Sequence, residues 1–176
     1  MTLRLNLGCG QHMARRPEWV NIDKHRFCDH IECVDSNPDL IADIREPLPF
    51  GDDSVDAIYC GHVLEHLPES EVIAALKEMR RVLVPGGRLG VVGPDYDRAV
   101  VIAEAGGTDM RSAIWPGAAT GQWDGEAHQW CATGPKTLEL VKQVFPDAVE
   151  VPITELDPFW PAVAFLEWQF AIEAAA

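Results

Sequence analysis

One short stretch near the start of the sequence most constrains the fold. Leu3–Gly10 reads LRLNLGCG, in which three leucines alternate with polar residues before two glycines. Alternation with a period of two predicts a β-strand, and the glycines predict a sharp turn directly after it. Because glycine has no Cβ, the backbone at Gly8 and Gly10 can lie against a ligand and offer its N–H groups. A short Gly-x-Gly also occurs in ordinary tight turns, so this stretch alone leaves both interpretations open.

Two further strand-like segments each end in a carboxylate. They are Trp19–Asp23 (WVNID) and Asp39–Asp43 (DLIAD). In parallel α/β sheets ligands bind beyond the carboxyl ends of the strands, so the glycine turn, Asp23 and Asp43 are expected at one edge. One carboxylate can accept both hydroxyls of a ribose, and a second can accept an adenine amino group. The arrangement therefore predicts a nucleoside site.

Strands and helices alternate through the middle of the chain. The segment 54–60 is largely apolar, which is typical of a central strand covered on both faces. A helix is predicted from Glu69 to Val84, ended by Pro85-Gly86-Gly87, because its apolar residues recur at helical spacing. Arg88–Gly93 is the next strand. This order implies right-handed crossovers and a parallel sheet.

The later part of the sequence is less regular. Short helices are predicted over 98–105 and from a Thr133 cap to Pro146. Alternating valines and an isoleucine over 149–153 predict a strand, which Pro152 limits to an edge or irregular position. In the segment 166–172, apolar alternation favours a strand while alanines and glutamates favour a helix.

Four segments between Leu5 and Asp95 resemble, in order, the motifs of class I S-adenosylmethionine-dependent methyltransferases. They read LNLGCG, VNID, ADIREPLPFGDDSVDAIYCGHVLEHLP and LKEMRRVLVPGGRLGVVGPD. The resemblance implies an α/β fold, a Rossmann-like doubly wound, mostly parallel sheet with a C-terminal antiparallel hairpin, and it decides the segment 166–172 as a strand. It also implies S-adenosylmethionine as cofactor. We expect one methyltransferase domain over 1–176, with 96–133 as a covering insertion on the acceptor side.

The resemblance also assigns positions around the cofactor. Gly8, Cys9 and Gly10 would line its methionine moiety, Asp23 would hold the ribose hydroxyls, Asp43 and Ile44 would meet the adenine, and Gly61 and His62 would lie beside the transferable methyl.

The sequence departs from the family at the first connection. Gln11 and His12 follow Gly10, where the family often has a third glycine. Asp23 also comes earlier than the roughly 20 positions of a dinucleotide-binding unit. Because Pro17 interrupts the segment between the two strands, the helix there is expected to be short or missing.

The expected chemistry needs orientation more than a catalytic side chain. The methyl group on a sulfonium is already electrophilic, and holding an acceptor atom in line is worth on the order of 7–11 kcal/mol. A general base adds roughly 10²–10⁴-fold where the acceptor must lose a proton. The candidate bases are His62, His66, Asp95 and His128. For His62 the alternative is a contact that positions backbone, and Glu65 and His66 are favoured for packing of the helix and loop.

Three tryptophans gather in the part of the sequence that the family motifs do not cover. Trp115, Trp123 and Trp130 are interleaved with glycines and lack helical or strand periodicity. They fit a loop over the site, with rings that could stack on a sugar or aromatic acceptor. They fit equally well as residues of a satellite core.

Composition narrows the partners. The formal net charge is −14, with 28 acidic and 14 basic residues, which disfavours nucleic acid as acceptor because phosphates are bound mainly by lysine and arginine. No apolar run approaches the about 20 residues of a membrane span, and the start lacks the pattern of a signal peptide. Five cysteines, an odd number, fit a reducing compartment. We expect a cytoplasmic protein; the sequence leaves its oligomeric state open.

One cluster of potential metal ligands occurs in the sequence. His25, Cys28, His30 and Cys33 have a spacing that fits no standard zinc module, so we expect no metal there and assign none to the site.

The sequence thus predicts transfer of a methyl group from S-adenosylmethionine to an O or N atom of a small molecule or saccharide. One alternative is a cofactor-binding regulatory or partner protein without turnover. Another is a dinucleotide-dependent oxidoreductase, against which Met13 stands at the third glycine position of G-x-G-x-x-G. The identity of the acceptor stays open.

Overall fold

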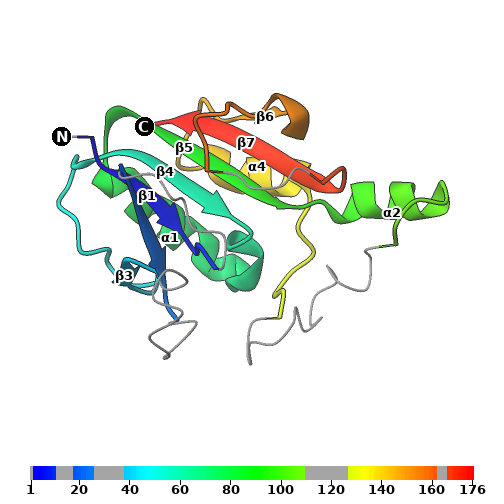
Figure 1. Ribbon diagram of the computed structural model, residues 1–176, viewed down its shortest axis with the longest axis horizontal. Coiled ribbons are helices and arrows are strands. Elements are labelled where there is room, and N and C mark those ends of the chain that lie inside the picture. Colours follow the sequence, from blue (N-terminus) through cyan, green and yellow to red (C-terminus); the bar gives the residue numbers. More distant parts are fainter. Residues whose placement is uncertain (1, 11–17, 26–37, 110–126, 162–165) are drawn as a thin grey trace.

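The protein is built around one seven-stranded sheet (Figure 1). The computed structural model describes residues 2–10, 18–25, 38–109, 127–161 and 166–176. The strand order is β3-β2-β1-β4-β5-β7-β6. The strands are β1 (Arg4–Leu7), β2 (Trp19–Asp23), β3 (Leu40–Ile41), β4 (Val55–Gly61), β5 (Leu83–Pro94), β6 (Val149–Val151) and β7 (Gln169–Ala175). The first five strands in this order, from β3 through β2, β1 and β4 to β5, run parallel to one another. Strand β7 is antiparallel to both of its neighbours, β5 and β6. The predicted sheet is confirmed.

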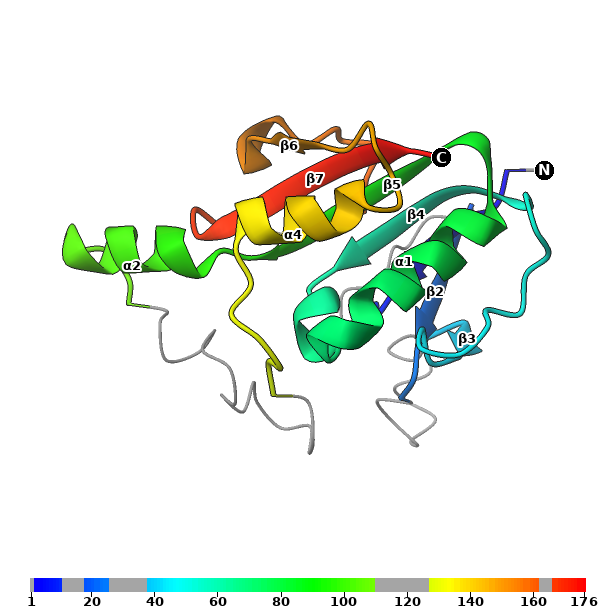
Figure 2. The same cartoon turned by 180° about the vertical axis from the view of Figure 1, so that it is seen from behind.

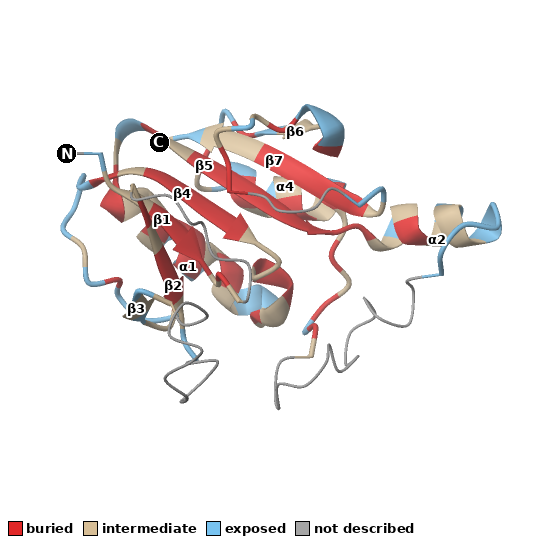
Figure 3. Cartoon of the chain, viewed as in Figure 1, coloured by how far each residue is buried: buried red, intermediate tan, exposed pale blue. Residues whose placement is uncertain are grey.

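Two helices cover one face of the sheet (Figure 2). They are α1 (Glu69–Val82) and α4 (Gly134–Lys142), while α2 (Tyr96–Glu104) extends from the end of β5. Two short 3-10 helices, η2 (Leu64–His66) and η3 (Ile153–Glu155), complete the described elements. The main core lies between the helices and the central strands, where Figure 3 shows mostly buried residues. Its fully buried side chains include Leu5, Leu7, Ile58, Leu76, Val141 and Phe145.

The segment that follows β6 covers part of the opposite face. Trp160 is 2% exposed and packs with Trp19 and Tyr59. A Cβ at Gly90 would lie 2.9 Å from its ring, so this glycine lets the indole approach the sheet. The guanidinium carbons of Arg4 and Arg88 lie 4.3 and 4.6 Å from the ring centre of the neighbouring Phe159. Aromatic rings and the arginine side chains stacked on them therefore cover this part of the sheet.

The main departure from the predicted elements is at the end of α1. The helix ends at Val82, and β5 begins at Leu83, so the predicted end at Val84 is wrong. Leu83 is already extended and pairs with Val55, and a register shift follows before Ala57 pairs with Arg88. Tertiary strand pairing thus outweighs the local helical pattern and draws Pro85-Gly86-Gly87 into the strand.

Other boundaries move by a few residues. β3 has two residues instead of five, and β7 begins at Gln169 and runs on to Ala175. Ile153, predicted at the end of a strand, begins η3, because Pro152 cannot donate to the ladder. Among the described residues, no helix has both the length and the apolar character that a membrane crossing needs.

Candidate functional site

The carboxyl ends of four neighbouring strands share one edge of the sheet. Leu7 pairs with Ile22 on one side and with Cys60 on the other. Asp23 pairs in turn with Ile41 of β3. The residues that follow these strands, predicted to contact a nucleoside, therefore start from the same edge.

The glycine turn after β1 packs against the chain that leaves β4. Gly8 and Gly10 have φ values of 61° and 49°, in the left-handed region that favours glycine. A Cβ on Gly8 would lie 2.2 Å from Cγ2 of Val63, so no larger residue fits there without movement. The turn is thereby fixed beside the end of β4, where Gly61 and His62 lie.

The Asp23 carboxylate lies over this turn. Its Oδ2 accepts a hydrogen bond from the Gly10 N–H at 3.0 Å, and its Oδ1 accepts one from the His25 N–H at 3.1 Å. The residue is half-buried. Each carboxylate oxygen has a second lone pair, so the group can still accept hydroxyl donors. The structure thus brings together Asp23, predicted at the ribose, and Gly10, predicted at the methionine moiety.

Cys9 is a structural member of the turn. Its N–H donates to the Ile22 carbonyl at 3.1 Å, which ties the turn to β2. Burial raises the pKa of its thiol to about 12, and the charges of Asp23 and Asp39 act in the same direction. The thiol is therefore uncharged at neutral pH and is not a nucleophile.

The predicted adenine contacts lie in the turn after β3. Arg45 donates its side-chain Nε and its backbone N–H to Oδ1 of Asp43, each at 3.0 Å. The Arg45 side chain is the main cause that lowers the pKa of Asp43. Ile44 is buried in the main core. Asp43 is thus a charged hydrogen-bond acceptor that is paired with the guanidinium group of Arg45.

His62 is held at its backbone and at its ring nitrogen Nε2. It has a φ of 56°, and its N–H donates to the Val92 carbonyl at 2.8 Å. Its Nε2 lies 2.6 Å from Nε2 of Gln169, whose Oε1 accepts from the Leu166 N–H. The Gln169 amide therefore presents a donor, which makes Nε2 of His62 an acceptor and leaves the proton on Nδ1. These contacts favour the positioning role for His62.

Asp95 caps a helix. Its side chain accepts hydrogen bonds from the backbone N–H groups of Arg98 and Gly134, at 3.2 and 3.1 Å, and Arg98 Nε lies 3.2 Å from Oδ2. The residue is 2% exposed. The predicted cap at Thr133 is also present, accepting from the Lys136 N–H. Asp95 thus joins the starts of α2 and α4, and its carboxylate is engaged in doing so.

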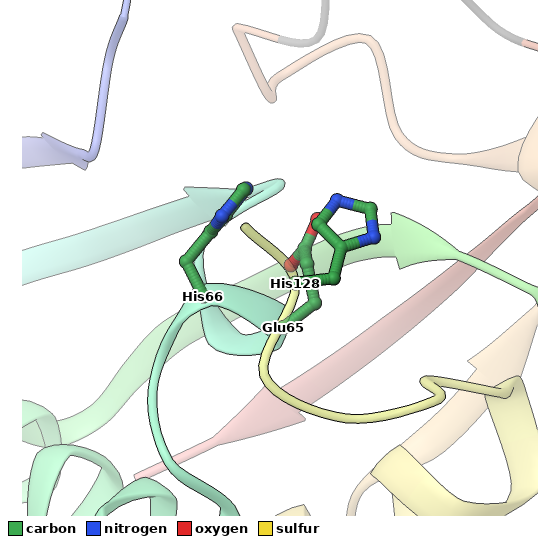
Figure 4. A group of neighbouring side chains, drawn as sticks. All are labelled: Glu65, His66 and His128. Carbon is green, nitrogen blue, oxygen red and sulfur yellow. The ribbon is translucent and has the colours of Figure 1, made fainter. Parts of the chain in front are cut away.

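Glu65, His66 and His128 form a compact group beside His62 (Figure 4). The rings of His66 and His128 are 4.8 Å apart and nearly perpendicular. Nδ1 of His62 lies 3.2 Å from Oε1 of Glu65. Burial alone raises the pKa of Glu65, but contact with His62 and the charge of His66 outweigh it, so the pKa lies below its ordinary value.

Sequence reasoning missed two contributions to this site. Gln169 comes from the far end of the chain and reaches His62 because β7 pairs with β5. Glu65 was expected to serve packing, yet its carboxylate faces the imidazoles. The histidine-rich HVLEH string was the available signal for Glu65, whereas nothing in the sequence pointed to Gln169. Of the three tryptophans, Trp130 is a core residue, while Trp115 and Trp123 lie outside the described residues, as do Gln11, His12, Cys28, His30 and Cys33.

Known proteins share both sequence and fold with this chain. Residues 5–91 match the family model described as "Methyltransferase domain". A probable tRNA methyltransferase 9B of Homo sapiens is 39% identical over 71 residues, covering 40% of this chain and 13% of that protein. A ubiquinone/menaquinone biosynthesis C-methyltransferase of Hahella chejuensis is 40% identical over 68 residues, covering 39% of this chain and 24% of that protein. The chain thus spans less than a quarter of the length of these two relatives.

A solved structure shows the same fold along nearly the whole chain. It is a SAM dependent methyltransferase from Archaeoglobus fulgidus, with a TM-score of 0.65 and 14% identity, covering 99% of this chain and 86% of that one. The fold is that of an α/β protein, and its glycine turn with the Asp23 carboxylate lies where the sequence predicted a nucleoside site. Residues 5–91 thus match the methyltransferase family, and the fold is that of an S-adenosylmethionine-dependent methyltransferase, as the sequence predicted. The family's methyl donor, S-adenosylmethionine, is the cofactor that these findings indicate.

Proposed function

We propose that this protein transfers the methyl group of S-adenosylmethionine to an O or N atom of a small molecule or saccharide. The observation that carries the proposal is the Asp23 carboxylate fixed over the glycine turn by the Gly10 N–H. A charged acceptor at that place matches the ribose hydroxyls of the cofactor. The family match favours this methyl donor over a dinucleotide.

The proposed contacts follow the edge of the sheet. The methionine moiety lies along the turn 8–10, the ribose on Asp23, the adenine by Asp43 and Ile44, and the methyl beside Gly61 and His62. The register of β1 with β2 and β4 supports this order. Residues 96–133 form the acceptor side of the single domain, and the excess of acidic residues favours a small acceptor over a nucleic acid. A cytoplasmic location is part of the proposal, supported by the odd number of cysteines.

Orientation supplies most of the proposed rate enhancement. The acceptor atom is held in line behind the methyl, where positioning is worth on the order of 7–11 kcal/mol. As the new bond forms, the carbon–sulfur bond breaks and its electrons stay on sulfur as S-adenosylhomocysteine. His62 positions the end of β4 in this scheme. Asp95 is left out of the proposed catalytic residues because its carboxylate holds α2 and α4.

Calorimetric titration with S-adenosylmethionine and S-adenosylhomocysteine tests the cofactor site. We expect saturable binding that Asp23→Ala weakens by about 1.5–3 kcal/mol, the range for a lost charge-assisted hydrogen bond. Asp147→Ala, which removes an exposed carboxylate, is the matched control and should bind like the wild type. NAD is the control ligand. A preference for NAD, or an unchanged affinity in Asp23→Ala, would overturn the assignment.

Turnover is tested separately by following S-adenosylhomocysteine formation with hydroxyl- and amine-bearing small molecules and saccharides. Product with at least one acceptor is the expected result. Tight cofactor binding without product across the panel would contradict the enzymatic proposal and favour a regulatory or partner protein.

A further inference from the structure

Three side chains able to bind a metal ion converge next to the proposed methyl position. Glu65 and His66 are consecutive residues of η2, and His128 comes from the segment that precedes α4. One potential ligand atom from each residue lies within 4.8 Å of the other two. Figure 4 shows the Glu65 carboxyl beside the His128 ring, with the His66 ring facing the same space.

Two of these ligand atoms are buried and lack a hydrogen bond. They are Oε1 of Glu65 and Nδ1 of His66. The contact from His62 to Oε1 is close, at 3.2 Å, but it is not aligned as a hydrogen bond. A buried polar atom without a hydrogen-bond partner is costly, so such atoms are uncommon in native proteins and one explanation is an ion that is not present in the structure. Both atoms belong to the same cluster, and Nδ1 of His62 is the polar group beside Oε1 of Glu65.

The backbone around the cluster holds His128 against η2. The Gln129 N–H donates to the Glu65 carbonyl at 2.7 Å, and Trp130 Nε1 donates to the Leu64 carbonyl at 3.1 Å. Trp130 is itself buried in the main core. The two segments are therefore fixed to each other directly after His128, which is the preorganisation that a ligand set needs.

We propose that Glu65, His66 and His128 bind one divalent transition-metal ion. Two imidazoles and a carboxylate suit zinc, iron, cobalt or nickel better than magnesium or calcium. Two nitrogen or oxygen ligands on a tetrahedral zinc ion lie about 3.4 Å apart, so side-chain movements of up to about 1.4 Å would close the cluster into a site. From the sequence alone we assigned no metal to the site. The sequence could not bring these ligands together, because His128 is far from Glu65 along the chain, and the present proposal replaces that expectation.

Neighbouring residues support the cluster as positioning residues. His62 presents Nδ1 to the Glu65 carboxylate and is itself oriented by Gln169. Groups that orient a metal ligand typically contribute 10–100-fold to metal affinity. The left-handed backbone of His62 and its contact with Gln169 of β7 thus both help to orient the Glu65 carboxylate.

A role for the ion rests on the proposed function. Three protein ligands leave coordination positions open, and an acceptor hydroxyl bound there would lose its proton more readily. The proton passes to water, the oxygen forms its bond to the methyl carbon, and the carbon–sulfur bond breaks with its electrons left on sulfur. The proposal therefore favours an oxygen acceptor whose hydroxyl can bind a metal.

Titration of the chelator-treated full chain with Co²⁺, followed by visible absorption, tests the site directly. We expect one Co²⁺ per chain in the wild type. His66→Ala and His128→Ala should each weaken binding at least about 100-fold, since they remove ligands and not merely the groups that orient them. His25→Ala is the matched control, because it removes an exposed histidine of the other potential cluster, and it should bind like the wild type.

Cofactor affinity measured on the same samples separates the two proposals. A variant that binds S-adenosylhomocysteine like the wild type is folded, and its loss of Co²⁺ then supports the metal site. Wild-type protein that binds S-adenosylhomocysteine but not Co²⁺ overturns the metal site and leaves the proposed function intact. Two further results would overturn the metal site at Glu65, His66 and His128. Loss of Co²⁺ binding in His25→Ala, or a sulfur-to-cobalt charge-transfer band, would place the ion at the cluster that contains the cysteines. Should His128→Ala fail to fold, the half-buried His66 supplies the decisive variant.

Discussion

The two halves of the chain use their polar side chains differently. In the half that ends at β5, Asp23 and Asp43 are half-buried and accept hydrogen bonds from groups at the carboxyl ends of the strands, Gly10 for Asp23 and Arg45 for Asp43. In the half that follows, Asp95 and Gln169 are buried and join elements distant in sequence. The carboxylates of the first half still have lone pairs that can accept hydrogen bonds from a ligand. The polar groups of the second half are already used in hydrogen bonds between elements of the fold. Under the proposed function, the part that matches the family holds the cofactor and the other part mainly supports it.

Trp160→Ala tests the supporting half most severely. Truncating a fully buried tryptophan typically costs about 3–5 kcal/mol, and here it also removes the donor to Oε1 of Glu173 at 2.8 Å. We expect a loss of that size in urea unfolding followed by circular dichroism, with cofactor affinity unchanged in the folded protein. A loss under about 1 kcal/mol would show that the ring contributes little to this face.

Asp95→Ala is the second test, and it distinguishes support from catalysis. Removing this cap leaves buried donors unpaired, so we expect the free energy of unfolding to fall by about 2–3 kcal/mol. Asp97→Ala, at an exposed position in the first turn of α2, is the control and should change it by less than about 0.5 kcal/mol. Unchanged stability together with lost methyl transfer would instead place Asp95 among the catalytic residues.

Arg45→Ala should have the smallest effect, because it acts in the binding half at a half-exposed ion pair. The expected loss at pH 7 is under about 1 kcal/mol. Since the pKa of Asp43 is lowered in the folded state, this contribution is present above its ordinary value of 3.8 and disappears as the pH falls below it. Unfolding curves of wild type and variant should therefore converge in acid. A difference that persists at low pH would show that Arg45 acts through packing.

Much of the fold followed from local pattern. Leucine alternation before the glycine turn and the helical spacing of apolar residues in α1 correspond to elements of the structure. The antiparallel position of β7 came from the family resemblance, because its composition alone pointed both ways. The end of α1 was misplaced because the pairing of Leu83 with Val55 is a tertiary interaction that periodicity within a helix does not report.

The site was predictable where its residues follow strands that lie side by side. Asp23 and Gly10 meet because parallel strands end together, a rule that needs no knowledge of side-chain packing. The contacts of His62 with Gln169 and of His66 with His128 depend on where distant segments pack. No spacing in the sequence encodes those distances, so the supporting contacts appeared only in the structure.

The position of β7 between β5 and β6 has a consequence for the growing chain. Strand β5 is complete well before Gln169 is synthesised, and its partner on that side, β7, pairs along Arg88–Pro94. At about 5–20 residues per second, the edge of β5 stays open for several seconds on the ribosome. Arg88 lies on that open edge, and a charged side chain there discourages pairing with a neighbouring nascent chain. The order of synthesis therefore makes β5 the strand most in need of protection until translation reaches β7.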